Sequence, residues 1–86
     1  MHRWAVTALG VARRLGFAER VRTVRAQDEL TFVLESGLEL RFGDASDFRT
    51  KLAVARAILP RAGDVGYLDV SAPDRPVAGG NPQVSG

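Results

Sequence analysis

Residues 30–42 read LTFVLESGLELRF, and this stretch decides the fold. Two runs of alternating apolar and polar side chains flank a Ser-Gly pair, a pattern typical of a β-hairpin. A two-residue loop would set the apolar side of one strand opposite the charges of the other, which a buried face forbids. A three-residue loop at residues 35–37 avoids this and needs a left-handed residue last, which Gly37 supplies. The predicted pairs are Leu34 with Leu38, Phe32 with Leu40, and Leu30 with Phe42.

The elements around this hairpin follow from hydrophobic periodicity. Apolar side chains at helical spacing predict helices over residues 4–15 and 47–59, and the second is expected to be capped by Ser46 or Asp44 and ended by Pro60. Alternation predicts further strands over residues 20–26 and 65–72. The order α-β-β-β-α-β predicts the α+β class, with an antiparallel sheet packed by two helices.

The length and composition describe one small globular domain. The chain has 86 residues, of which 45% are hydrophobic and 26% charged. We predict a single α+β domain over residues 1–77 and a disordered C-terminal tail over residues 78–86, which are rich in Gly, Pro and Ser. No apolar stretch approaches the roughly 20 residues that span a bilayer, so we expect this chain alone to carry neither anchor nor export signal.

Catalytic and metal-binding chemistry has little material in this sequence. Cysteine is absent, which excludes disulfides and thiolate metal sites, and His2 is the only histidine. Asp44 and Asp47 stand close together, but both fall where helix caps are expected. Asp64 and Asp69 lack the further acids of a cation site. We therefore expect no enzyme activity, no cofactor and no metal, with a fragment of an enzyme as the least favoured alternative.

Basic side chains are concentrated near the N-terminus. Residues 1–25 hold six arginines against Glu19 alone, although the net charge of the whole chain is only +2. Such a segment can contact nucleic acid, so a small Arg-rich nucleic-acid-binding module is an alternative function. Because few aromatic residues interleave with these arginines, we favour a solvated charged face.

Two stretches resemble a known family. These are LELRFGDASDFRTKLAVARAILP at residues 38–60 and VGYLDVSAPDRPV at residues 65–77. They are similar to the end of the extracytoplasmic β domain of the FtsQ/DivIB family of bacterial cell-division proteins. In that family a strand ends in Gly, a helix follows with a Lys near its middle, which Lys51 matches, and a last strand carries an Asp, which Asp69 matches. Complete members also have a transmembrane helix, a POTRA domain and further β-domain strands upstream.

The resemblance implies a scaffold function rather than catalysis. Family members recruit partners of the FtsB and FtsL type at the outer face of the bacterial cell membrane, where a membrane-anchored parent protein holds the domain. A partner segment adds as a further strand to the edge of the last strand of the β domain, and backbone hydrogen bonds supply the affinity. Placed on this sequence, the implied partner-binding residues are Tyr67, Leu68, Asp69, Val70, Ser71, Ala72 and Pro73.

Overall fold

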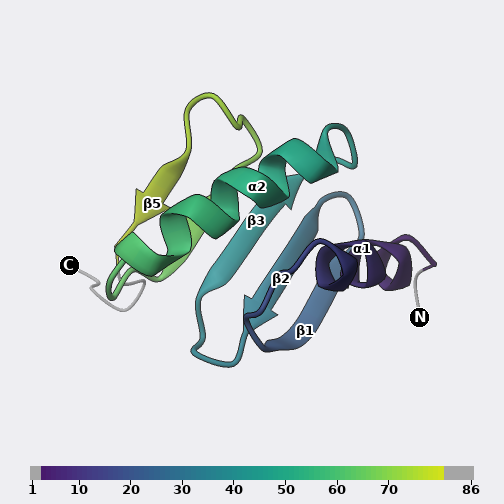
Figure 1. Ribbon diagram of the computed structural model, residues 1–86, viewed down its shortest axis with the longest axis horizontal. Coiled ribbons are helices and arrows are strands. Elements are labelled where there is room, and N and C mark those ends of the chain that lie inside the picture. Colours follow the sequence, from purple (N-terminus) through teal and green to yellow (C-terminus); the bar gives the residue numbers. More distant parts are fainter. Residues whose placement is uncertain (1–2, 81–86) are drawn as a thin grey trace.

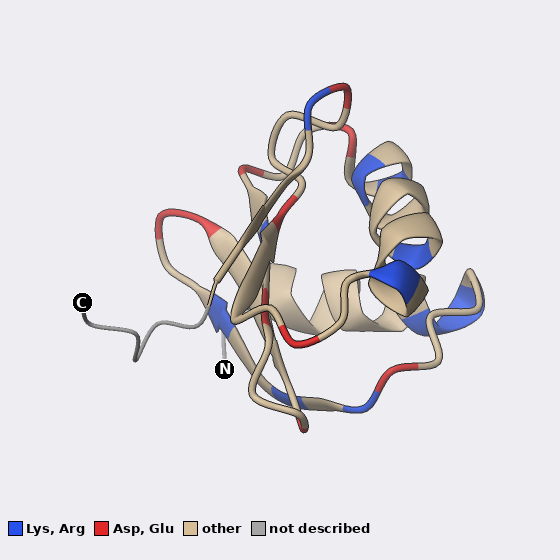
Figure 2. Ribbon diagram, turned by 90° about the vertical axis from the view of Figure 1, so that its left-hand side faces the viewer, with Lys and Arg blue, Asp and Glu red and all other residues tan. Residues whose placement is uncertain are grey.

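Two helices cover one face of a five-stranded sheet in the computed structural model, which describes residues 3–80 (Figure 1). The chain runs through α1 (Arg3–Arg14), β1 (Val21–Ala26), β2 (Leu30–Leu34), β3 (Glu39–Gly43), α2 (Phe48–Ile58), a 3-10 turn η1 (Leu59–Arg61), β4 (Tyr67–Asp69) and β5 (Val77–Gly79). Figure 2 shows the sheet nearly edge-on, with both helices on the same side. The predicted α+β class and the order of its elements are confirmed.

The strands lie in the order β1-β2-β3-β4-β5. Neighbours are antiparallel except β3 and β4, which are parallel. The expectation of a wholly antiparallel sheet is therefore wrong in this one pair. The reason is the connection: α2 carries the chain across the sheet face, and a crossover of this kind returns the next strand in the same direction as the last.

The register of the β2–β3 hairpin is confirmed at its loop. Phe32 pairs with Leu40, and the N–H of Leu34 donates to the carbonyl of Leu38 at 2.9 Å. Gly37 has φ +95°, the left-handed conformation that the three-residue loop requires.

The far end of this hairpin differs from the prediction. Leu30 pairs with Gly43 rather than Phe42, because the register shifts between Leu30 and Thr31. The shift leaves Leu30 and Phe42 both fully buried. The apolar face is therefore the predicted one, although the predicted pairing at this end was wrong by one residue.

A second irregularity lies in β1 and sets which side chains face the helices. The register shifts between Val21 and Thr23, and Val21 pairs with Leu34 while Val24 pairs with Phe32. An extra residue between the two valines keeps both on the helix-bearing face, where uninterrupted alternation would separate them. The core face of β1 thus continues along the strand.

The core is one cluster between the helices and the sheet. Phe32 and Phe42 are completely buried and their ring centroids lie 4.9 Å apart; Phe48 from α2 lies 4.9 Å from Phe42. Burying one such ring contributes about 1.5–3 kcal/mol. From α1 come the small buried side chains Ala5, Ala8 and Ala12.

Helix α2 begins differently from the prediction. Asp47, in a left-handed conformation with φ 54°, is the N-cap residue, and no side chain caps the helix. Asp44 and Ser46, the expected caps, bond instead to one another, with the Ser46 N–H donating to Asp44 Oδ1 at 3.0 Å. The loop therefore satisfies its own polar groups and leaves the helix end to solvent.

The C-terminal part holds the largest difference from the sequence prediction. The predicted strand over residues 65–72 is reduced to β4, and Val77–Gly79, which the prediction divided between domain and tail, form β5. The domain therefore extends beyond residue 77. The remainder of the predicted tail, residues 81–86, lies outside the described residues, as does His2.

Candidate protein-binding edge

Only the first three of the predicted partner-binding residues 67–73 belong to a strand, β4, and the others follow it. Leu68 and Val70 are buried against the helices, so they belong to the core. Tyr67 and Asp69 alternate with them and are half-buried on the opposite face. Beyond the strand, Ser71 and Ala72 are exposed and Pro73 is half-buried. The seven residues thus comprise a short strand and the loop that follows it.

The edge expected at β4 is not free. β3 pairs with one side of β4, and β5 pairs with the other through Tyr67–Gly79, Leu68–Ala78 and Asp69–Val77. The expectation that residues 67–73 form the outer edge is therefore wrong, because the chain turns after Pro73 and its own fifth strand, β5, pairs with the outer side of β4. The edge strand at the C-terminal side of the sheet is β5 (Figure 1).

Gly79 fits β5 to the face of Tyr67. A Cβ atom at Gly79 would fall within the Tyr67 ring, so only glycine permits this approach. Arg41 also contacts this ring, and its guanidinium carbon lies 4.1 Å from the ring centroid. Such a cation–π contact contributes about 0.5–1 kcal/mol at an exposed site. Tyr67 therefore joins β3, β4 and β5 on the open face of the sheet.

Asp69 serves the turn that follows β4. Its Oδ1 accepts hydrogen bonds from the Ser71 N–H at 2.9 Å and from the Ser71 hydroxyl at 2.6 Å. An aspartate that bonds the backbone two residues on is a common turn device, which explains an acidic residue in a strand. The resemblance matched Asp69 to an Asp in the family's last strand, and in this structure its side chain serves the local turn.

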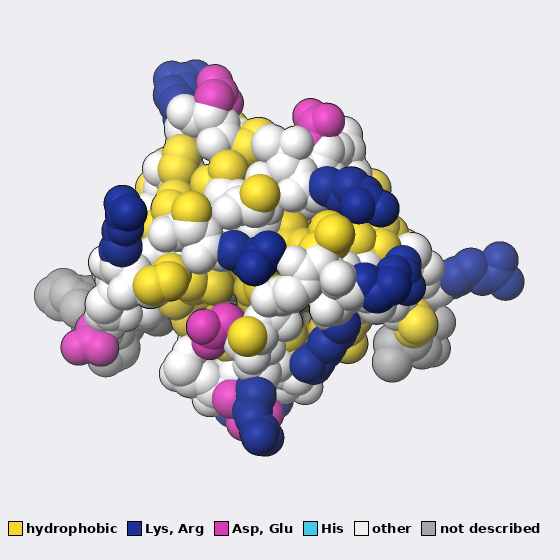
Figure 3. All heavy atoms as spheres, in the orientation of Figure 1, with side chains coloured by type: hydrophobic (Ala, Val, Ile, Leu, Met, Phe, Trp, Pro, Cys, Tyr) yellow, Lys and Arg dark blue, Asp and Glu magenta, His cyan; other side chains and the backbone are white. Residues whose placement is uncertain are grey.

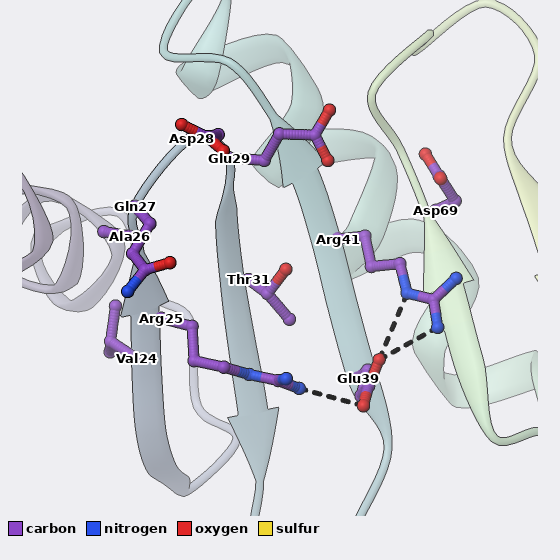
Figure 4. A pocket seen from close by; sticks show the side chains of 10 residues that line it. All are labelled: Val24, Arg25, Ala26, Gln27, Asp28, Glu29, Thr31, Glu39, Arg41 and Asp69. Atoms are coloured by element: carbon purple, nitrogen blue, oxygen red, sulfur yellow. Dashed lines mark hydrogen bonds and ion pairs between the residues drawn. The ribbon is translucent and has the colours of Figure 1, made fainter.

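A charged row crosses the open face of the sheet, and sequence reasoning missed it (Figure 4). Glu39 on β3 accepts a hydrogen bond from Arg25 on β1 at 2.9 Å and from Arg41 on its own strand at 2.9 Å. The two cations hold the pKa of Glu39 below its ordinary value, through the hydrogen bond from Arg41 first and that from Arg25 second. Since all three side chains are partly exposed, each pair contributes at most about 1 kcal/mol.

This charged row lines a shallow hollow between the β1–β2 turn and β4. Val24, Thr31 and Asp69 also line it (Figure 4). The hydrogen-bonding capacity of Glu39 is largely taken up by the two arginines, whereas Asp28 and Glu29, which also line the hollow, make no ion pair within residues 3–80. The paired charges therefore support the sheet, and the unpaired ones lie at the β1–β2 turn.

A buried lysine ties the loop before α2 to the helix. Lys51 is 2% exposed, and its Nζ donates to both the carbonyl and Oδ1 of Asp44 at 3.1 Å. Its aliphatic stem lies in the core while its ammonium group reaches the loop, as long cationic side chains commonly do. The resemblance marked the position of Lys51 in the helix, but periodicity gave no sign that it is buried.

Titration of Asp44 tests this loop. Hydrogen bonds from Ser46 and then Lys51 lower the pKa of Asp44 from 3.8 to about 2. Because the folded-state pKa is depressed, the carboxylate stabilises the fold above pH 3.8, and this contribution is lost as the pH falls toward 2. We expect Ser46→Ala to raise the pKa of Asp44 toward 3.8, measured by NMR titration of its carboxyl carbon.

Ser71→Ala is the matched control for that titration. It removes the equivalent serine hydroxyl from Asp69 and leaves Asp44 untouched. An unchanged Asp44 pKa in Ser46→Ala would contradict the role assigned to the Ser46 hydroxyl.

The described part of the chain offers no constellation for metal chemistry. Among residues 3–80, no group of three or more His, Cys, Asp or Glu is placed to hold a metal ion. No helix within the same residues has the length and apolar character needed to cross a membrane. What the structure does present is backbone: two strand edges, β1 and β5, at opposite sides of the sheet.

Comparisons with protein-family models, with curated proteins and with solved structures found no match.

Proposed function

We propose that this chain is a non-catalytic scaffold segment of the bacterial cell-division complex and binds a partner protein by strand addition at its C-terminal strand. Support comes from the resemblance of residues 38–60 and 65–77 to the FtsQ/DivIB β domain and from an α+β fold that suits it. In this proposal the partners are of the FtsB and FtsL type, and a membrane-anchored parent protein holds the domain outside the membrane.

The observation that carries the proposal is the outer edge of β5, which lacks most of the usual protections of an edge strand. Natural edge strands are commonly protected by shortness, charges, bulges or proline within the strand. β5 is short, with three residues, but Val77, Ala78 and Gly79 include no charge, bulge or proline, and Val77 is 52% exposed. Such an edge can accept a further strand, and the exposed valine gives that strand an apolar contact.

The geometry of β5 identifies the backbone groups that a partner would use. The carbonyl of Gly79 accepts a hydrogen bond from the N–H of Gly66, on the side of β4. Backbone groups of successive residues point to opposite sides of a strand, so the N–H and C=O of Ala78 point away from β4. Ala78 is therefore the residue whose amide a partner strand would bond.

Ala78→Pro tests this proposal. It removes the outward N–H and leaves the bonds of Val77 and Gly79 to β4 in place. We expect the affinity for the extracytoplasmic segments of FtsB- and FtsL-type proteins from the same genome to fall about tenfold or more, as measured by isothermal titration calorimetry.

Ala78→Val is the matched control, because it enlarges the side chain but keeps the N–H. Circular dichroism checks that both variants are folded. Equal affinity of Ala78→Pro and the unmodified chain would reject strand addition at β5, and absence of any binding by the unmodified chain would reject the scaffold function.

A further inference from the structure

The opposite edge of the sheet is built differently from β5. β1 carries a bulge at Val21–Thr23 and two arginines, features that protect an edge from indiscriminate pairing, so a segment that adds there needs a complementary charge. β1 is paired only with β2, and beside it runs a groove formed with α1. The residues of α1 that matter here are Val6, Leu9 and Arg13, and those of β1 are Val21, Arg22 and Val24. Val6 is 56% exposed, and it and Val77 are the two exposed large hydrophobic side chains of residues 3–80. Val6 therefore lies beside the β1 edge and Val77 on the β5 edge.

The backbone of β1 is available on the groove side. The N–H of Leu34 donates to the carbonyl of Leu38, just before β3, so alternation turns the backbone of the preceding residue, Val33, toward β1. Its partner Thr23 then faces β2, and the N–H and C=O of Val24 point outward. Val24 thus offers free backbone groups at the edge while its side chain lines the apolar groove. A strand laid along β1 would meet both.

Charge decides what kind of strand fits. Arg13 and Arg22 line the groove, and no carboxylate is among its lining residues. In Figure 3, basic side chains surround hydrophobic ones on the side of the molecule where α1 lies, and no acidic side chain lies among them there. An incoming segment with apolar residues for Val6 and Leu9 and carboxylates for the two arginines would match this surface.

Two other occupants fit less well. A second copy of the chain paired through β1 would bring the groove arginines of both copies into one interface, and the lining residues of the groove include no carboxylate to pair with them. Nucleic acid would match the arginines but would leave the apolar floor at Val6 and Leu9 without a partner. The groove is therefore better suited to a different protein segment.

We propose that the β1 edge and its groove bind an extended protein segment that combines apolar with acidic side chains. The chain would then carry two strand-addition sites, one at each edge of the sheet, with different selectivity. This site is independent of the one at β5, and neither depends on the other being occupied.

Selection from a random peptide library displayed on phage tests the proposal on the full chain. We expect the enriched peptides to carry both apolar and acidic residues and, as synthetic peptides, to shift the amide resonance of Val24 in NMR spectra. Val6→Glu and Arg22→Glu should each weaken binding about tenfold, by placing a charge in the apolar floor and by reversing a favourable charge.

Val77→Glu and Arg75→Glu are the matched controls at the β5 side. Both residues are exposed, as Val6 and Arg22 are, so all four variants should keep the fold. The controls should leave unchanged the affinity of the peptides that shift the Val24 resonance; loss of their binding in the controls alone would place them at β5 and overturn the proposal.

Three further results would overturn it. The first is enrichment of no peptide, or of peptides without acidic residues. The second is a dimer, seen by sedimentation, that Val6→Glu dissociates, which would assign the groove to a second copy. The third is a duplex DNA complex, well below the roughly 10⁻⁴–10⁻⁶ M of non-specific binding, that Arg22→Glu abolishes, which would assign the arginines to nucleic acid.

Discussion

Replacing Gly43 by alanine should lower the free energy of unfolding by about 3 kcal/mol. Gly43 has φ +73°, which costs a residue with a Cβ atom about 1 kcal/mol or more. The new Cβ would also lie 2.7 Å from the Cβ of Ser71, closer than two such atoms can approach. Gly43 is buried between β2 and the segment after β4, so moving either of them aside would cost stability.

Gly37→Ala separates the two contributions. Gly37 also has a positive φ, +95°, but a Cβ there would meet nothing within 4 Å. We therefore expect Gly37→Ala to cost only about 1 kcal/mol, with the free energies of unfolding of both glycine variants measured by urea titration. Adding Ser71→Gly to Gly43→Ala should restore part of the stability, because it removes the atom that the alanine meets. Equal losses for the two glycines would show that the contact with Ser71 contributes nothing.

Replacing Lys51 by alanine should be comparably damaging, at about 2–4 kcal/mol. The substitution leaves a cavity where the buried stem was and removes both hydrogen bonds to Asp44. Lys51→Met keeps most of the stem volume and loses only the ammonium group, so its cost should be about 1–2 kcal/mol. Chemical unfolding monitored by circular dichroism measures both.

Arg49→Ala on the exposed side of α2 serves as the control and should change stability by less than about 0.5 kcal/mol. If Lys51→Met were as stable as the unmodified chain, the hydrogen bonds to Asp44 would make no net contribution to stability. If Lys51→Met were as unstable as Lys51→Ala, packing of the aliphatic stem would make no contribution.

The strongest periodic signals were sufficient to predict most of the fold. Both helices and the first three strands lie within a residue or two of their predicted bounds, because each carries several apolar residues at its own period. Gly37 fixed the hairpin loop, since only one loop length kept both apolar faces together. The register shift at Leu30 left no trace in the sequence, because either pairing buries the same side chains.

The C-terminal region could not be predicted in the same way. Three residues, Val77–Gly79, are too few to show an alternation, and they stand among prolines and glycines that indicate a loop. β5 forms because β4 offers a tertiary template and because Gly79 can approach Tyr67. The candidate binding edge therefore moved from β4 to β5, whereas the basic groove at β1 required the position of α1, which one-dimensional periodicity does not contain.

The parallel pair β3–β4 divides the sheet into two parts with different folding requirements. Short turns join β1 to β2 and β2 to β3, so this meander closes only small loops as it forms. β4 can pair with β3 only after the whole crossover through α2 has been ordered, and β5 depends in turn on β4. Sub-global opening should therefore release β4 and β5 together as one cooperative unit while the meander persists. In that state β3 would itself become an edge, so the molecule exposes new template backbone before it unfolds globally.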